Sequence, residues 1–241
     1  MATYEYRYRL GITDIGKSNK ITNKAILKIL ENAGGMHSDA LGYGINDIPR
    51  TKKSWVLLNW KVEVLERPIY NEELKVITWA RDTNKVTTYR DYEIYDESNK
   101  LIIRATSRWA LINIDTKALT LLDKEMIEKY EPEEKTAFDY KTNEKLKEPQ
   151  QYSSKLDYKI LRSDIDINEH VHNLNYIDFA YEVLPEKIYK SDELNNIEIM
   201  YKKQIKFDDD IVCLYSNENN QHTVSIKSKD GKVLHSIIKL Y

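Results

Sequence analysis

The sequence lacks the features of a secreted, membrane-spanning or nucleic-acid-binding protein. A single cysteine among 241 residues excludes an intrachain disulfide and is typical of a reducing compartment. Apolar runs are short, with residues 55–60 among the longest, so no segment approaches the length of a membrane span. The formal net charge of -2 gives no argument for binding nucleic acid or an anionic membrane. The first residues also lack the apolar core of a signal peptide, and we expect a cytoplasmic protein.

The most informative segment lies between residues 162 and 176 and leads into a helical pattern. Asp166, Asn168 and His170 lie two residues apart, and the apolar residues Ile165, Ile167 and Val171 are interleaved with the polar ones. Alternation of this kind places the polar side chains on one side and anchors the other side in a core. Reactive groups are commonly held still in this way.

The same segment has a counterpart earlier in the chain. Residues 8–15 align with residues 158–165 at a constant offset of 150, which pairs Asp14 with Asp164. The first copy has Gly16, Ser18 and Lys20 where the second copy has Asp166, Asn168 and His170. Internal repeats indicate how a chain is divided into similar units. Shared residues are therefore expected to be structural, and residues of the second copy alone to be chemical, which predicts one active site per chain.

Apolar periodicity predicts the same order of elements in both halves. In the first half we expect a strand at 3–10, a helix at 22–41 and strands at 55–65, 73–81, 86–95 and 101–114. In the second half we expect a strand at 157–161, a helix at 173–183 and strands at 197–207, 211–216, 223–227 and 233–241. Long strands joined by turns, with one helix, are typical of an antiparallel sheet packed on a helix, so the fold class is α+β.

Residues 131–154 differ in composition from both halves. They are rich in Glu and Lys, poor in apolar residues, and include Pro132 and Pro149. This composition predicts a solvated linker. We therefore divide the chain into an N-terminal domain at 1–130, a charged linker at 131–154 and a C-terminal domain at 155–241.

Gly34 and Gly35 lie inside the predicted helix at 22–41. Each costs a helix about 1 kcal/mol relative to alanine. Glycine is retained at such positions where another part of the chain approaches closely, so we expect this helix to be tightly enclosed.

Two metal-binding interpretations of the polar segment fail on spacing. A calcium loop would begin at Asp164, but Glu169 stands where glycine is required and Asn175 where a bidentate glutamate is required. For zinc, His170 and His172 are two residues apart, do not share a helix face, and have no cysteine or further histidine cluster nearby. We expect no metal and no cofactor.

A carboxylate, a carboxamide and an imidazole at this spacing favour hydrolysis of a carbonyl compound. Asp166 would act as a nucleophile or as the base that activates water, and His170 would transfer protons or hydrogen-bond the carbonyl. Asn168 would orient the water or stabilise the oxyanion, helped by backbone N–H groups at the helix start. The alternative is that all three are turn and capping residues. Residue types alone leave both interpretations open.

The motif Asp-Ile-Asn-Glu-His at 166–170, followed by Asn173 and Tyr176, resembles the second repeat of the acyl-acyl carrier protein (acyl-ACP) thioesterases of bacteria and plant plastids. The resemblance covers nearly the whole chain and includes residues 31–34, 40–44, 55–57, 90–96, 104–109, 162–164 and 197–203. It implies a tandem (double) hotdog fold, in which two antiparallel sheets each wrap a long central helix. It also implies a catalytic C-terminal hotdog and an acyl-binding N-terminal hotdog without the catalytic motif. Carried over by motif, the catalytic groups are Asp166, Asn168 and His170.

The sequence departs from the plant enzymes after this motif. Their Tyr-Arg-Arg-Glu-Cys stretch reads Tyr-Lys-Lys-Gln-Ile at 201–205, so Gln204 replaces a glutamate and Ile205 a once-favoured cysteine nucleophile. Gln204 cannot ionise, and we expect it, with Asn173, to orient water or the oxyanion by hydrogen bonding.

Two further residues are expected to be structural. His172 stands at an asparagine position of the family, which we interpret as a variant of the helix start. Cys213 lies in the apolar run 211–215, where a buried and unreactive thiol is expected. Loss of the family's cysteine at position 205 also removes a thiol mechanism.

Together these inferences predict a bacterial-type thioester hydrolase that releases free fatty acid from acyl-ACP. Its expected partner is an ACP with a phosphopantetheine-linked acyl chain, docked through residues 50–53 or through Lys202, Lys203 and Lys206. We expect a monomer or a homodimer. The alternatives are an acyl-CoA thioesterase, and a non-hydrolytic acyl-binding or regulatory hotdog protein.

Overall fold

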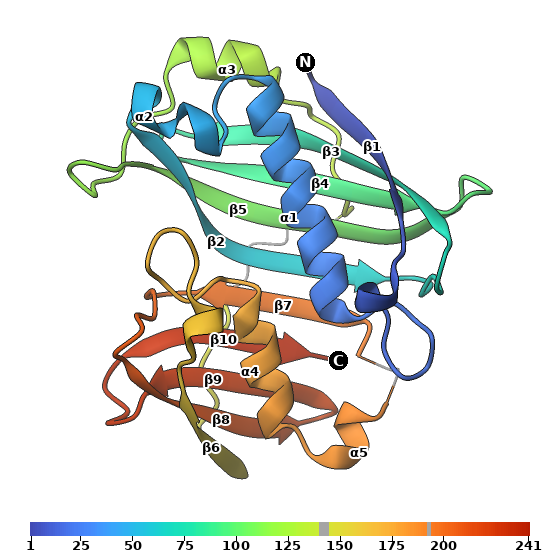
Figure 1. Ribbon diagram of the computed structural model, residues 1–241, viewed down its shortest axis with the longest axis vertical. Coiled ribbons are helices and arrows are strands. Elements are labelled where there is room, and N and C mark those ends of the chain that lie inside the picture. Colours follow the sequence, from blue (N-terminus) through green and yellow to red (C-terminus); the bar gives the residue numbers. More distant parts are fainter. Residues whose placement is uncertain (140–144, 192–193) are drawn as a thin grey trace. The chain divides into compact units, whose positions relative to one another are not determined.

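The computed structural model describes residues 1–139, 145–191 and 194–241. The chain divides into two compact units, Met1–Thr142 and Asn143–Tyr241. Over the described residues, each unit is an antiparallel sheet of five strands with one main helix lying across a face (Figure 1). No helix in these ranges is long and apolar enough to cross a membrane.

The first unit begins with strand β1 (Thr3–Arg9), followed by helix α1 (Asn23–Ala40) and strands β2 (Lys53–Val64), β3 (Glu73–Asn84), β4 (Thr87–Tyr95) and β5 (Leu101–Asn113). Its shorter helices are η1 (Ile12–Asp14), η2 (Ile45–Asp47), α2 (Ile48–Thr51) and α3 (Lys124–Tyr130). The strands lie in the order β1-β3-β4-β5-β2 and every neighbouring pair is antiparallel. Residues Ile26, Leu30 and Ala33 of α1, at helical spacing, are fully buried against this sheet.

The second unit repeats this order. It contains β6 (Ser154–Lys159), η3 (Arg162–Asp164), α4 (Asn175–Val183), α5 (Glu186–Tyr189), β7 (Asn196–Tyr201), β8 (Asp210–Glu218), β9 (Gln221–Ser228) and β10 (Leu234–Leu240). The strands lie in the order β7-β10-β9-β8-β6, again antiparallel. In each unit the first strand is therefore at one edge and the strand that follows the main helix is at the other.

The predicted order of elements is confirmed, but two boundaries in the second unit differ. The strand expected at 197–207 ends at Tyr201, because the N–H groups of Lys202 and Lys203 both converge on the His235 carbonyl and the ladder stops there. The helix expected from residue 173 begins at Asn175 and has 9 residues, half the 18 of α1. The second sheet thus packs on a shorter helix than expected.

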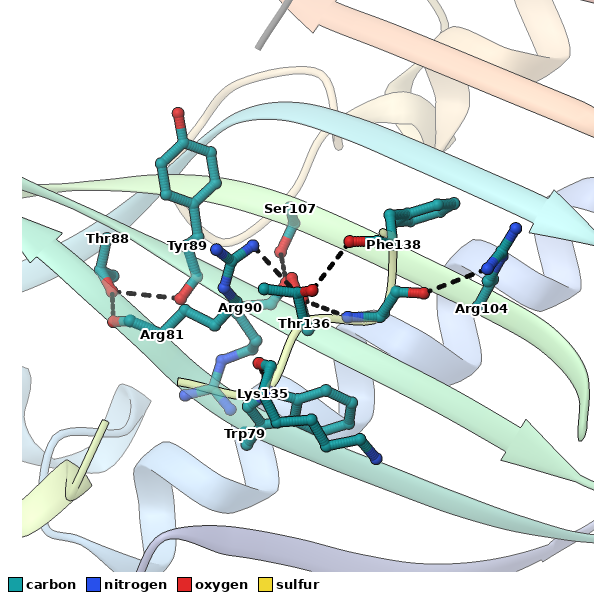
Figure 2. A network of polar contacts seen from close by, with 12 residues as sticks. Trp79, Arg81, Thr88, Tyr89, Arg90, Arg104, Ser107, Lys135, Thr136 and Phe138 are labelled. Atoms are coloured by element: carbon teal, nitrogen blue, oxygen red, sulfur yellow. Dashed lines mark hydrogen bonds and ion pairs between the residues drawn. The ribbon is translucent and has the colours of Figure 1, made fainter. Parts of the chain in front are cut away.

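The segment expected to be a solvated linker is packed at its beginning. Residues 133–138 form a strap on the first unit, in which Ala137 and Phe138 are buried in a cluster with Trp79. The Trp79 indole N–H donates to the Lys135 carbonyl over 2.8 Å, and the Ala137 N–H donates to Asp91 Oδ2 over 2.8 Å. Figure 2 shows Trp79, Arg104 and the strap close together. The solvated linker therefore does not begin at residue 131.

Strand alternation decides which face of the sheet the strap covers. Trp79 and Asp91 are directly paired across β3 and β4, one position from the pair formed by Thr78 and Tyr92. Successive side chains of a strand point to opposite faces, and the Tyr92 hydroxyl lies against α1 at Gly34. The strap therefore packs on the face opposite α1. Burial there raises the pKa of the Asp91 carboxyl, and the hydrogen bond from the Ala137 N–H and the ion pair with Arg81 only partly offset this.

The two helix glycines differ in their surroundings. A Cβ at Gly34 would lie 3.1 Å from the Tyr92 hydroxyl and 3.2 Å from Arg90 Cδ, both on buried side chains of β4. A Cβ at Gly35 would meet no atom within 4 Å. Close enclosure is therefore confirmed for Gly34 and wrong for Gly35.

Alanine substitution should separate these two positions. Gly35→Ala should raise the free energy of unfolding by about 1 kcal/mol through helix propensity alone. Gly34→Ala gains the same propensity but overpacks Tyr92 and Arg90, at a cost of typically 1–3 kcal/mol, so its net effect should be destabilising. Urea unfolding of both variants measures this difference; equal stabilisation by both would contradict the packing described at Gly34.

Candidate active site

Residues 165–171 form a tight turn between η3 and α4. The Asp166 N–H donates to the His170 carbonyl over 2.8 Å, and the Glu169 N–H donates to the Asp166 carbonyl over 3.1 Å. Ile165 and Val171 pair as an antiparallel bridge at its base. Glu169 has a φ of 61°, in the left-handed region, which closes the turn. Residues 166–170, which lie between the bridged residues Ile165 and Val171, are called the polar loop.

The Asp166 carboxylate is bonded within the polar loop. Its Oδ1 accepts the backbone N–H groups of Asn168, over 2.8 Å, and of His170, over 3.3 Å. Its Oδ2 accepts the Asn168 side-chain amide over 3.4 Å. The structure thus brings the side chains of Asp166 and Asn168 together, in the local pattern that carboxylates often adopt in turns.

The His170 imidazole is not accounted for by such local bonding. Its Nδ1 is shielded from solvent and has no hydrogen-bond partner within the described ranges. A buried polar atom without a partner costs roughly 1–3 kcal/mol and calls for an explanation such as a functional role. His170 is therefore the member of the polar loop that a turn-forming role does not explain.

The first unit contains the same turn without the three side chains. The Gly16 N–H donates to the Lys20 carbonyl over 2.9 Å, and the Asn19 N–H donates to the Gly16 carbonyl over 3.1 Å. Asn19 has a φ of 62°, matching Glu169. Since Gly16 has no side chain, the turn forms without a carboxylate at this position. The hydrogen bonds of Asp166 are therefore not what gives the polar loop its backbone.

The carboxylates shared by both copies have equivalent structural contacts. Asp14 Oδ2 accepts the Gly11 N–H over 2.9 Å, and Asp164 Oδ2 accepts the Leu161 N–H over 2.8 Å. Both side chains are buried. Although burial raises the pKa of Asp14, hydrogen bonds from Lys28, Gly11 and Tyr8 outweigh it and hold that pKa below its usual value. Each aspartate therefore fastens the one-turn helix, η1 or η3, that precedes this turn.

A second loop adjoins the polar loop. The β7–β8 loop, residues 202–209, lies beside it because the Val171 N–H donates to the Ile205 carbonyl over 2.8 Å and His170 pairs with Lys206 as a bridge. The first unit repeats both contacts, with the Ile21 N–H donating to the Pro68 carbonyl over 3.0 Å. Gln204, which precedes Ile205, is exposed on this loop.

The position of Gln204 is clarified by its counterpart in the first unit. Arg67, which precedes Pro68, donates from Nη2 to Asn23 Oδ1 over 2.7 Å. Asn23 is the counterpart of Asn173 in the repeat, so Gln204 and Asn173 occupy the positions of a bonded pair. The second unit has the shorter, uncharged side chain there, and the Asn173 carbonyl accepts the Tyr201 hydroxyl over 3.1 Å.

Both units match one family of proteins. Residues 1–130 match the family model of the acyl-ACP thioesterase N-terminal domain, and residues 147–239 match that of the C-terminal domain. The chain belongs to the acyl-ACP thioesterase family. Its two units therefore form the tandem hotdog fold expected from the sequence.

Several acyl-ACP thioesterases are similar to this family member. The chloroplastic oleoyl-ACP thioesterase of Coriandrum sativum is 27% identical over 243 residues, covering 93% of this chain and 65% of the relative. A chloroplastic palmitoyl-ACP thioesterase of Gossypium hirsutum is 26% identical, covering 88% of this chain and 55% of the relative. The chain thus spans less than two thirds of the length of these curated relatives.

Solved structures give the same result. The crystal structure of an acyl-ACP thioesterase from Bacteroides thetaiotaomicron matches with a TM-score of 0.86 and 25% identity, covering 99% of this chain and 96% of that one. The 12:0-ACP thioesterase from Umbellularia californica matches with a TM-score of 0.87 at 17% identity, which supports the fold alone.

His172, at an asparagine position of the family, contributes to the start of α4. Its Nδ1 accepts the Leu174 N–H over 3.2 Å, whereas Thr22 Oγ1 accepts the Ala25 N–H over 3.1 Å at the start of α1. The imidazole reaches one residue less far along the chain than the threonine hydroxyl does. This difference accompanies the later start of α4.

Cys213 and possible metal ligands were the other candidate groups in the sequence. Cys213 is fully buried, and burial raises the pKa of its thiol to about 12, so it is not a nucleophile at neutral pH. No group of three or more His, Cys, Asp or Glu residues placed to hold a metal ion occurs in the part of the chain that the structure describes.

Sequence reasoning missed one residue beside this site. His235, in β10, is buried and its Nδ1 lies 3.0 Å from the Lys203 carbonyl of the β7–β8 loop. Aligning the two halves in this region would have placed His235 opposite Ile102, another difference between copies. The repeat that is evident in the sequence covers residues 8–15 and 158–165, and this position lies outside it.

The equivalence of the two turns predicts how the polar loop tolerates substitution. Giving it the residues of the first copy, Asp166→Gly, Asn168→Ser and His170→Lys, should lower the free energy of unfolding by less than about 2 kcal/mol, since the net value of a lost hydrogen bond is about 1 kcal/mol. Asp164→Ala should cost more, because it removes a buried carboxylate and leaves the Leu161 N–H at the start of η3 without its partner. Thermal and urea unfolding measure both; a triple variant that does not fold would show that the three residues are structural.

Proposed function

We propose that this chain hydrolyses the thioester of fatty acyl-ACP to free fatty acid and carrier protein. The observation that carries the proposal is the polar loop itself. The two units share one turn, and only the second carries a carboxylate, a carboxamide and an unpartnered imidazole on it. Membership of the acyl-ACP thioesterase family supplies the substrate class.

In the proposed reaction Asp166 acts as a general base. Both of its oxygens already accept hydrogen bonds, which favours orienting and deprotonating a water molecule over direct attack by the carboxylate. The water oxygen adds to the thioester carbonyl and its proton passes to Asp166. Asn168 and His170 hydrogen-bond the oxyanion or the attacking water. Collapse of the tetrahedral intermediate breaks the C–S bond. The phosphopantetheine sulfur takes up the proton held by Asp166 and leaves as the thiol.

Gln204 and Asn173 would orient the water in this scheme. They occupy the positions at which Arg67 and Asn23 bond each other in the first unit. The roles of the two units follow the repeat, with an acyl-binding N-terminal unit that includes residues 133–138 and a catalytic C-terminal domain at 155–241. We propose a cytoplasmic enzyme; the plant relatives are named as chloroplastic.

The proposal predicts which esters are hydrolysed and which variants have a lower kcat. Free-acid release should be seen with acyl-ACP of some chain length, and Asp166→Asn and His170→Gln should each lower kcat by 10²–10⁴-fold, the usual contribution of a general acid or base. Lys20→Ala, at the counterpart of His170 in the first unit, is the matched control and should keep wild-type activity. Release is measured with a panel of acyl-ACP and acyl-CoA esters of equal chain lengths.

Two outcomes of that panel would overturn the proposal. Release from CoA esters at a higher kcat/KM than from ACP esters would make the chain an acyl-CoA thioesterase. Bound ester that is retained without release by the wild type would make it an acyl-binding protein.

Of the two docking surfaces expected from the sequence, we favour the lysines of the β7–β8 loop. Arg50 donates to the Gly42 carbonyl and pairs with Asp47, and Lys53 pairs with Asp123, so those charges are already engaged. Lys202, Lys203 and Lys206 are exposed. They lie on the loop that pairs with the polar loop, where an acidic carrier would bring its thioester closest to Asp166.

Charge reversal tests this surface. Lys202→Glu with Lys203→Glu should raise KM for acyl-ACP about 10-fold or more, because like charges facing an acidic partner weaken its encounter and binding, and should leave KM for the corresponding acyl-CoA within twofold. Lys52→Glu is a matched control on the other surface. Equal effects on both ester classes would point to damage of the site, and no effect on either would place the carrier elsewhere.

A further inference from the structure

His235 connects the sheet of the second unit to the β7–β8 loop. The side chain is buried, and its Nδ1 lies 3.0 Å from the Lys203 carbonyl. A carbonyl only accepts hydrogen bonds, so Nδ1 carries the proton and donates it. The His235 carbonyl in turn accepts the N–H groups of Lys202, over 2.8 Å, and of Lys203, over 3.3 Å. Main chain and side chain of one residue thus hold the start of the loop.

His235 owes this geometry to a β-bulge. In the pairing of β10 with β9, Leu234 lies opposite Lys227 and Ser236 lies opposite Ile226, which leaves His235 as the extra residue. A bulge bends its strand and redirects a side chain, and bulges are frequent beside active sites. The imidazole is therefore directed at the Lys203 carbonyl by the register of the sheet.

The first unit shows which part of this arrangement is structural. Ile102 is the extra residue of the corresponding bulge in β5, and its carbonyl accepts the N–H groups of Leu65, over 2.8 Å, and Glu66, over 3.1 Å. Ile102 is as buried as His235 but has no side-chain donor. The bulge and its two backbone bonds therefore form without an imidazole. Only the unit with the polar loop adds the side-chain bond.

The path from His235 to the polar loop is short. Lys203 is two residues from Ile205, whose carbonyl accepts the Val171 N–H over 2.8 Å. Val171 follows His170, which itself pairs with Lys206. A displacement of the Lys203 carbonyl is thus passed along the chain to Ile205, across one backbone hydrogen bond to Val171, and from there to the adjacent His170.

We propose that His235 is a positioning residue for the proposed thioester hydrolysis, and that it sets the place of His170 by fixing the β7–β8 loop. The inference rests on the proposed function for its kinetic consequence. The structural consequence, a more firmly held Val171–Ile205 hydrogen bond, does not depend on any substrate.

Two variants separate the hydrogen bond from the volume of the side chain. His235→Asn keeps a donor, Nδ2, at the place of Nδ1, whereas His235→Leu fills the space without a donor. With the acyl-ACP ester that the wild type prefers, His235→Leu should lower kcat about 10-fold with KM within twofold, since small misplacements of reacting groups reduce rates by up to about 10²-fold. His235→Asn should stay within about twofold of the wild type.

His222 provides the matched control within the same sheet. It is another buried histidine, hydrogen-bonded to the Tyr215 hydroxyl over 2.8 Å, and it pairs with Leu240 at the end of β10 away from His235. His222→Leu should destabilise the fold without lowering kcat. Amide hydrogen exchange at Val171, followed by NMR, should remain unchanged in His235→Asn and should quicken in His235→Leu by more than the loss of global stability in His222→Leu produces.

The outcomes distinguish this inference from the proposed function. Wild-type kcat in His235→Leu with unchanged exchange at Val171 would overturn the positioning role, as would equal losses of kcat in His235→Leu and His222→Leu. If the wild type releases no acid from any ester, the proposed function fails, and exchange at Val171 alone then decides whether His235 holds the loop.

Discussion

The hydrogen bond from the Val171 N–H to the Ile205 carbonyl joins the two loops on which the candidate groups of the second unit lie. On one side of it are Asp166, Asn168 and His170, and on the other is Gln204. Ile205 is fully buried, and a buried backbone group left without a partner is costly. The register of the two loops is therefore held by the requirement to keep this bond, and side chains can vary around it.

The repeat separates the backbone that carries the site from the groups that could react. The turn at 16–20 reproduces both backbone hydrogen bonds of the turn at 166–170, although its residues are unsuited to hydrolysis. The same holds at the bulges, where Ile102 supports the backbone that His235 also supports. A feature found in both units is explained by folding, and one found only in the second needs another reason. The first unit thus serves as a reference for the second within one chain.

Much of the fold and the place of the candidate site could be predicted from the sequence, for physical reasons. Strand and helix periods are properties of local segments. The alternation around Asp166 predicts one polar and one anchored side, which is confirmed for the buried Val171 but wrong for Ile167, which is 76% exposed. The early end of β7 could not be predicted, because it depends on a bulge in β10, which is distant in the chain. The strap was missed because Ala137 and Phe138 are too few to form a periodic pattern, and the exposure of Gly35 depends on α1 facing away from β4 there.

The strap has a consequence for dividing the protein into fragments. The family model of the N-terminal domain ends at residue 130, but an isolated first unit cut there would uncover the Trp79 indole and leave the buried Asp91 carboxylate without the Ala137 N–H. Residues 133–138 are packed on the sheet of the first unit and are part of that unit, not of a linker. A fragment that represents the first unit should therefore extend at least to Phe138.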